Sequence, residues 1–312
     1  MNMNMNMNKE NYNRGIFFAF LTALVSGSAI FFSSFAVKVL KDPFVFTTLK
    51  NIIVALVLCS FFILYKKWGE LKLIKTKEWI YLILIGIIGG GASFLLFFKG
   101  LSMTSAIAGG FIHKTLFVWV SILAVIFLKE KLGKIQWVAL GILVLGNFLL
   151  GAFNSFRFGA GEMMILLATI LWSFEYVLAK KVLSNLDSLT VAWARMFFGS
   201  FVLISYLLIN GKASQLFLLD KNQWGWIVLT AMFLLGYVTL WYRALKLAPA
   251  SAVSSVLVVG SPITTLLSLI FISGFKVNEL QIGGIILIIA GLFIFFTFQR
   301  KSQEPQRLAF NA

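Results

Sequence analysis

GIFFAFLTALVSGSAIFFSSFAV, residues 15–37, contains no charged residue. A helix that crosses the ~30 Å hydrocarbon core of a bilayer needs about 20 apolar residues, and this stretch meets that length. It is longer than the apolar part of a cleaved signal peptide and has no small-residue cleavage motif at its end. Because it does not alternate strictly between polar and apolar residues, a barrel strand is a poor alternative. We therefore expect a first membrane-spanning helix here.

Nine further runs of this kind follow in the chain of 312 residues. They cover residues 44–64, 79–98, 104–128, 135–151, 159–179, 188–209, 224–242, 250–272 and 279–298. Overall, 60% of the residues are hydrophobic and 12% are charged, against about 45–50% and about 25% in an ordinary soluble domain. This composition argues against a soluble enzyme, a disordered chain and a nucleic-acid-binding domain. It predicts an all-α membrane protein with ten transmembrane helices, whose surroundings are the lipid bilayer.

The distribution of positive charge predicts the orientation of the chain. With the N-terminus in the cytoplasm, 17 of the 27 Lys and Arg residues fall in cytoplasmic segments, seven in outer loops and three inside spans. Cytoplasmic loops carry the excess of Lys and Arg in membrane proteins. We expect both termini to be cytoplasmic in a multi-pass protein of the cell inner or cytoplasmic membrane. The net charge of +16 lies in short clusters between apolar runs, so no nucleic-acid partner is expected.

The two halves of the chain resemble each other. The stretch FFKGLSMTSA at 97–106 aligns with WYRALKLAPA at 241–250, and Lys50 and Arg195 each follow an Asp by eight residues. Each half holds five spans, and an odd number reverses the direction in which the second copy enters the membrane. This arrangement predicts two inverted-topology five-helix repeats, at 14–151 and 159–298, as in many secondary transporters. A disordered cytoplasmic N-terminus at 1–13 and a cytoplasmic tail at 299–312 complete the expected organisation.

The sequence lacks the residues for a disulfide, a zinc cluster or a nucleotide-binding phosphate loop. Cys59 and His113 are the only residues of their types, so neither an intrachain disulfide nor a Cys/His zinc cluster is possible. There is no GxxxxGK[ST] phosphate loop. No cofactor, metal site or enzymatic activity is expected.

The five-span repeat and two segments carry a resemblance to a known family. FLKEKLGKIQWVALGILVLG at 127–146 and LATILWSFEYVLAKK at 167–181 resemble the EamA branch of the drug/metabolite transporter superfamily, with Glu130 in the place of its acidic turn. The second copy departs from this pattern, with Ser273-Gly274 in place of Lys129-Glu130, so the acidic turn is not a two-fold symmetric element. The resemblance implies a carrier of metabolites, often an exporter of amino acids or related compounds.

Ionisable residues inside spans are costly and usually face a cavity or a partner. Lys50 and Arg195 occupy equivalent positions in the two repeats, and we expect them near opposite mouths of a central cavity. Either they attract a carboxylate or phosphate of the solute, or their side chains extend to lipid headgroups. Glu175 either pairs with Arg195 across helices, or it carries a proton or binds an amine of the solute. We expect the charged groups of Glu175 and Arg195 within about 4 Å of each other or bridged by one water.

Other polar and aromatic side chains complete the candidate substrate site. His113 and Lys114 lie mid-span and about 100° apart on a helix, so at least one is expected to face the cavity. Trp119, Trp172 and Tyr176 either line an amphipathic pocket or anchor the protein at the interface. Ser26 and Ser33 contact substrate or bond to their own backbone. Pro262 interrupts the ninth span as a structural kink or a gating hinge, and Gly109 and Gly110 permit close helix packing.

These residues together predict a secondary transporter for a small polar or zwitterionic metabolite, with amino acids as the first candidates. The family resemblance implies export as the direction. The candidate substrate-binding residues are Lys50, His113, Lys114, Trp119, Trp172, Glu175, Tyr176 and Arg195. Three alternatives stay open: an exchanger or importer of phosphorylated or nucleotide-like metabolites, a cationic-drug exporter, and an integral membrane enzyme acting on lipid. A monomer is compatible with this sequence.

Overall fold

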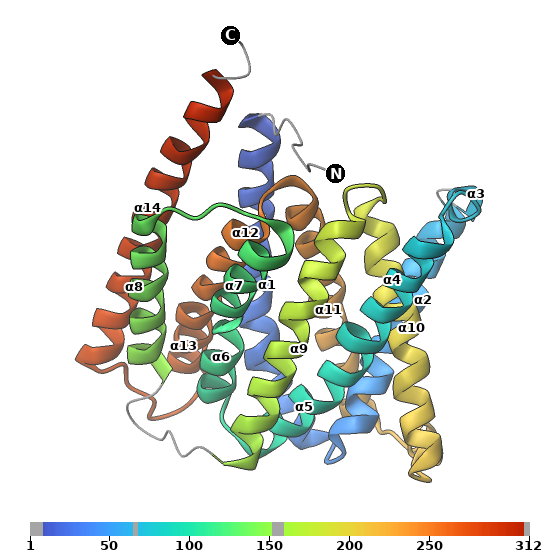
Figure 1. Cartoon of the computed structure of the whole chain (residues 1–312). Coiled ribbons are helices and arrows are strands. Elements are labelled where there is room, and N and C mark those ends of the chain that lie inside the picture. Colours follow the sequence, from blue (N-terminus) through green and yellow to red (C-terminus); the bar gives the residue numbers. More distant parts are fainter. Residues whose placement is uncertain (1–8, 65–67, 152–158, 309–312) are drawn as a thin grey trace.

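The computed structural model describes residues 9–64, 68–151 and 159–308, which form helices and turns without a β-strand in those ranges (Figure 1). The helices are α1 (Lys9–Val39), α2 (Pro43–Leu64), α3 (Trp68–Leu71), α4 (Thr76–Ile85), the π-helix η1 (Gly86–Ala92), α5 (Ser93–Met103), α6 (Ala106–Lys114), α7 (Leu116–Leu128), α8 (Lys134–Gly151), α9 (Ala160–Val182), α10 (Ser188–Ile209), the 3₁₀ helix η2 (Ala213–Phe217), α11 (Lys221–Leu247), α12 (Ala250–Val256), the 3₁₀ helix η3 (Leu257–Val259), α13 (Gly260–Phe271) and α14 (Glu279–Leu308).

Ten segments of the described chain are long and apolar enough to cross a membrane, and they match the ten predicted spans. The third span consists of α4, η1 and α5, the fourth of α6 and α7, and the ninth of α12, η3 and α13. The predicted fold class, an all-α membrane protein built from two inverted five-helix repeats, is therefore confirmed.

The N-terminal boundary differs from the prediction. Helix α1 begins at Lys9, so residues 9–13 are helical and not disordered as expected. Glu10 lies in the first turn of α1, where its negative charge interacts favourably with the positive end of the helix dipole. The Met-Asn repeat at 1–8 lies outside the described residues. At the other end, α14 continues beyond the predicted span to Leu308.

The two repeats pack against each other through helices that are distant in the sequence. Helix α8 packs along α14, and α1 packs along α11. Helix α1 begins and α14 ends on the same side of the molecule (Figure 1, top). Gly146 of α8 and Gly284 of α14 lie so close that a Cβ on Gly146 would be 2.8 Å from the Gly284 carbonyl oxygen. Small residues of this kind let two membrane helices approach closely.

The fourth and ninth spans are interrupted at equivalent positions. Helix α7 begins at Leu116 and α13 at Gly260, which are separated by the same 144 residues as the aligned stretches at 97–106 and 241–250. The 3₁₀ helix η3 directly precedes the turn that holds Pro262, whose nitrogen has no hydrogen to donate. In the fourth span the amide of Thr115 donates to the Ile112 carbonyl oxygen at 3.1 Å, which tightens the turn without a proline. The two repeats therefore share an irregular turn near mid-span.

Asp42 connects the start of α2 to the second repeat. Its carboxylate accepts hydrogen bonds from the amides of Phe44 at 2.8 Å and Val45 at 3.3 Å, and it pairs with Lys212 at 2.5 Å. Partial burial raises the pKa of Asp42, but the bonds from Lys212 and the two amides outweigh that effect and lower the pKa below its usual value. The carboxylate is therefore held in its charged form at this end of the molecule.

Candidate functional site

An internal cavity of about 60 Å³ lies between the two repeats, with room for a few water molecules. Side chains from α1, α2, α5 and α6 of the first repeat and α9, α10 and α11 of the second repeat line it. The lining residues are Ser26, Ala29, Ile30, Ser33, Lys50, Phe94, Phe97, Phe98, His113, Trp172, Tyr176, Arg195, Thr230, Leu234 and Tyr237. Five of the eight candidate site residues are among them: Lys50, His113, Trp172, Tyr176 and Arg195.

Lys50 reaches the cavity from α2 through a group of phenylalanine rings. Its Nζ lies 3.6 Å from the centroid of the Phe98 ring, 4.8 Å from that of Phe46 and 5.9 Å from that of Phe94. The residue is 3% exposed, so it does not extend to a headgroup as the alternative interpretation supposed. Among the residues that the structure describes, no carboxylate pairs with this ammonium.

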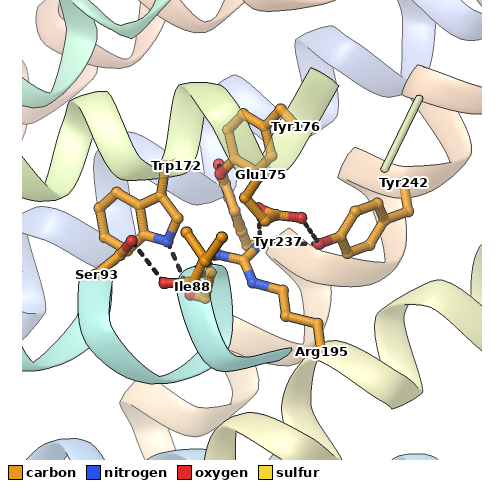
Figure 2. Close-up of polar contacts among 9 residues, drawn as sticks. Ile88, Ser93, Trp172, Glu175, Tyr176, Arg195, Tyr237 and Tyr242 are labelled. Atoms are coloured by element: carbon orange, nitrogen blue, oxygen red, sulfur yellow. Dashed lines mark hydrogen bonds and ion pairs between the residues drawn. The ribbon is translucent and has the colours of Figure 1, made fainter. Parts of the chain in front are cut away.

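Arg195 and Glu175 form the ion pair that the sequence predicted. The Arg195 Nη1 atom lies 3.7 Å from Glu175 Oε2, and both side chains are fully buried. The Tyr242 hydroxyl donates to Glu175 Oε1 at 2.6 Å and accepts from Arg195 Nη1 at 3.4 Å (Figure 2). The expectation that these two groups lie within about 4 Å is confirmed. Glu175 itself does not line the cavity, because its carboxylate is directed to Arg195 and Tyr242 in the wall.

The π-helix η1 supplies a carbonyl to this network. The Gly89 carbonyl oxygen accepts from Trp172 Nε1 at 2.9 Å and from Arg195 Nη2 at 3.2 Å. The wider hydrogen-bond pattern of a π-helix removes carbonyls from the regular α-helical ladder and frequently occurs at functional sites. The Ser93 hydroxyl similarly donates to the Ile88 carbonyl oxygen at 2.7 Å. One irregular turn thereby orients both the aromatic and the cationic side chain at the cavity.

Lys50 and Arg195 line the same cavity, in agreement with the expectation of a central cavity between the repeats. The Lys50 Nζ atom is 5.9 Å and the Arg195 Cζ atom 5.4 Å from the centroid of the same ring, that of Phe94. The repeats pack so that both symmetry mates point to the space between them. Both cations therefore lie close to the Phe94 ring.

Aromatic side chains from α9 and α11 pack together on one side of the cavity. The hydroxyls of Tyr176 and Tyr237 lie 2.6 Å apart. The Trp241 ring packs against both tyrosines, at centroid distances of 4.5 Å and 6.1 Å, and is fully buried. These three packed side chains form one side of the cavity wall and its backing.

Lys114 and Trp119 do not line the cavity, which corrects two predictions. His113 occupies the cavity-facing position, with its ring 5.1 Å from the Trp172 ring. Lys114 is rotated by about 100° around the helix from His113, and its Nζ donates to the Ser26 hydroxyl at 2.5 Å from behind the wall. Trp119 follows Lys114 by five residues, which rotates its side chain by a further ~140°. Its indole nitrogen has no hydrogen-bond acceptor among the described residues.

Sequence reasoning missed most of the aromatic wall. Phe94, Phe97 and Phe98 lie on one continuous apolar run, where phenylalanine is equally suited to face lipid. Tyr237 lies mid-span in α11 and bonds to Tyr176 of α9, within the second repeat. A tyrosine hydroxyl this far from either end of its span needs a buried partner, and that was the available signal.

The acidic turn after the fourth span has a defined structural role. The Glu130 carboxylate accepts from the amides of Ala250 at 2.7 Å and Ser251 at 3.1 Å and from the Ser251 hydroxyl at 2.5 Å. Lys180 Nζ donates to the carbonyl oxygens of Leu245 and, at 2.7 Å, of Ala248. A carboxylate from the first repeat thus caps the start of α12, and an ammonium from α9 caps the end of α11.

Comparisons with known proteins agree with this architecture. Residues 13–152 and 159–297 each match the model of the EamA-like transporter family. The chain is 27% identical to "Uncharacterized transporter YyaM" of Bacillus subtilis over 69% of this chain and 72% of that protein. It is 25% identical to an "Uncharacterized transporter" of Clostridium kluyveri over 95% of this chain and 97% of that protein. A solved crystal structure with 17% sequence identity covers 94% of the chain with a TM-score of 0.72 and shows the same fold.

Proposed function

Since the chain belongs to the EamA-like transporter family, we propose that it is a secondary transporter that moves a small carboxylate-bearing metabolite by alternating access. Amino acids are the first candidate solutes, and export across the cytoplasmic membrane is the proposed direction. The observation that carries this proposal is the cavity between the repeats, which is lined by the symmetry mates Lys50 and Arg195. Transporters with inverted repeats typically bind substrate near mid-membrane, where the repeats meet.

The charges around the cavity favour an anionic group on the solute. Lys50 and Arg195 line it and Lys114 lies directly behind it, whereas the nearest carboxylate, Glu175, is engaged in the wall. A cationic drug would need an acidic cavity, so that alternative has the least support. The buried cations suit a phosphorylated metabolite as well as a carboxylate. For an enzyme acting on lipid, no group of three metal-ligating side chains comes together within the described ranges.

Reconstitution into liposomes tests this proposal. The purified protein is assayed for uptake and counterflow of labelled amino acids, other carboxylates, sugar phosphates and organic cations, with and without an imposed pH gradient. We expect saturable movement of at least one carboxylate and none of the cations. Transport of cations alone, or hydrolysis of a lipid substrate in place of transport, would contradict the proposal. Stimulation by the pH gradient would identify a proton as the coupling ion.

A further inference from the structure

We propose that Lys50 is the anion-recognition group of the cavity, and that the solute is a monocarboxylate with an apolar or aromatic body whose amine, where present, adds little to binding. This inference rests on the proposed transport function and narrows its substrate class. It follows from the different ways in which the two cavity cations are balanced.

The charge of Arg195 is balanced inside the wall. Glu175 lies 3.7 Å away, and the Arg195 Nη2 atom donates to the Gly89 carbonyl oxygen at 3.2 Å. The Glu175 carboxylate also accepts from Tyr242 at 2.6 Å, which fixes its orientation toward the pair. Arg195 and Glu175 together therefore contribute no net charge to the cavity.

The charge of Lys50 is not balanced. Its contacts are the rings of Phe98, Phe46 and Phe94, which stabilise a cation through their faces but accept no conventional hydrogen bond. An ammonium carries three N–H donors, and leaving them without acceptors in a buried site is unfavourable. The side chain is 3% exposed and lines the cavity, so an acceptor that enters the cavity can reach it. A solute carboxylate supplies both the negative charge and the missing acceptors.

The rest of the wall suits an apolar body and offers little to an amine. Six aromatic rings surround the space, contributed by Phe94, Phe97, Phe98, Trp172, Tyr176 and Tyr237. Ile30 and Leu234 add apolar surface. The lining contains no carboxylate, and its other polar groups are the hydroxyls of Ser26, Ser33 and Thr230, the tyrosine hydroxyls and His113. An amine would therefore meet neutral groups, whereas a carboxylate would meet an unpaired ammonium.

Four matched ligands test this assignment on the purified full-length protein. They are 3-phenylpropionate (carboxylate alone), phenylalanine (carboxylate and amine), 2-phenylethylamine (amine alone) and 3-phenylpropionamide (neither charge). Affinity is measured by ligand-dependent thermal stabilisation. We expect 3-phenylpropionate and phenylalanine to bind with similar affinity and the other two at least about tenfold more weakly, because they lose the charge-assisted bond to Lys50. Phenyl phosphate, added as a fifth ligand, distinguishes a carboxylate site from a phosphate site by binding more weakly than 3-phenylpropionate.

Variants at position 50 identify the responsible group. Lys50→Gln should lower the affinity for both carboxylates to that for the amide, and Lys50→Arg should retain most of it. Lys99→Gln, which removes a lysine of α5 that does not line the cavity, serves as the matched control and should bind as the original protein does.

Several results would overturn the assignment. These are tenfold tighter binding of phenylalanine than of 3-phenylpropionate, tighter binding of phenyl phosphate, unchanged carboxylate affinity in Lys50→Gln, and failure of the original protein to bind either carboxylate. The comparison among ligands needs only the original protein, so it stands even where a variant fails to fold. Carboxylate transport that is independent of Lys50 would reject this inference and leave the proposed function intact. Absence of any transported carboxylate in liposomes would reject the proposed function itself.

Discussion

Glu175 and Arg195 are two opposite charges that are fully buried within the membrane-spanning part of the chain. The free energy of such a pair depends on both partners, because removing one leaves the other charged and without compensation in a poorly solvating environment. Their shared partner Tyr242 extends the pair into a network. The two side chains should therefore respond to mutation as one unit.

We predict that Glu175→Gln and Arg195→Gln each lower the free energy of unfolding by about 3–5 kcal/mol. The double variant should lose less than the sum, since it leaves no unpaired charge. The measurement is unfolding of the purified variants in one detergent by denaturant titration. Glu279→Gln, at an exposed position of α14, is the control and should change little. Strictly additive losses would show that the two residues are not coupled.

Unlike Arg195, Lys114 is a buried cation without a carboxylate partner among the described residues. Its one hydrogen-bond acceptor there is the Ser26 hydroxyl. Ser26 lines the cavity, so Lys114 positions a polar group of the wall. Burying an ammonium whose three N–H donors have one acceptor is unfavourable, and an apolar side chain of similar size removes that cost. We predict that Lys114→Met keeps or raises the melting temperature and strongly lowers transport. Uptake kinetics like those of the original protein would exclude Lys114 from the transport mechanism.

For individual residues, the sequence predicted which side chains matter better than it predicted which way those side chains face. The cost of a charge in a bilayer was sufficient to select Lys50, Glu175 and Arg195. Their expected depth on two consecutive spans suggested the Glu175–Arg195 pair. The sequence could not decide between His113 and Lys114, because the helix phase relative to the cavity depends on packing. The phenylalanines of α5 were missed for a related reason: an apolar ring is compatible with lipid and with a cavity wall.

The turn between α11 and α12 is the element on which charged groups from two other elements converge. Glu130, after α7, caps the first amides of α12, and Lys180, from α9, binds the last carbonyls of α11. A side chain that caps a helix N-terminus typically stabilises it by about 0.5–2 kcal/mol. These contacts should hold the turn between α11 and α12 in place.

We predict that Glu130→Ala increases amide hydrogen exchange in residues 248–253 and lowers the free energy of unfolding by about 1–2 kcal/mol. The reason is that the amides of Ala250 and Ser251 lose their acceptor. Hydrogen exchange followed by mass spectrometry is the measurement. Glu279→Ala, in the first turn of α14, is the matched control. Unchanged protection of residues 248–253 would show that Glu130 does not stabilise this turn.

The irregular elements were only partly predictable. Pro262 predicted an interruption of the ninth span because proline has no N–H to donate, and η3 lies directly before its turn. Thr115 marks an interruption without any residue that forces one, so its position depends on tertiary packing. The stretch GIIGGGA at 86–92 was rich in glycine, yet that composition alone does not distinguish a π-helix from close packing in an α-helix.

The ten spans and their inverted repetition were predictable because they follow from run length and from an internal similarity across the chain. The sequence could not predict which helices meet: α8 with α14, and α1 with α11, pair across the repeats. The cavity depends on those pairings, because it takes side chains from seven helices. The inverted repeat predicted that a central cavity exists. The residues that line it depend on how the helices pack.

The proposed orientation of the molecule predicts which connections face the cytoplasm. In a Cys59→Ser background, Leu73→Cys should react with a membrane-impermeant maleimide only in inverted vesicles, and Phe217→Cys only in intact cells. Both positions are highly exposed, at 82% and 86%, and they lie in connections assigned to opposite sides. Reaction of Leu73→Cys in intact cells would reverse the proposed topology.

The central claim of the proposed alternating-access mechanism is that one cavity opens to each side of the membrane in turn. Ser33 lines the cavity from α1, whereas Ser268 of α13 is fully buried away from it. The most direct test is the reaction of Ser33→Cys, again without Cys59, with the impermeant maleimide added to intact cells and to inverted vesicles. The account predicts labelling of Ser33→Cys from both sides and of Ser268→Cys from neither. Labelling of Ser33→Cys from one side alone, with and without a transported solute, would contradict it.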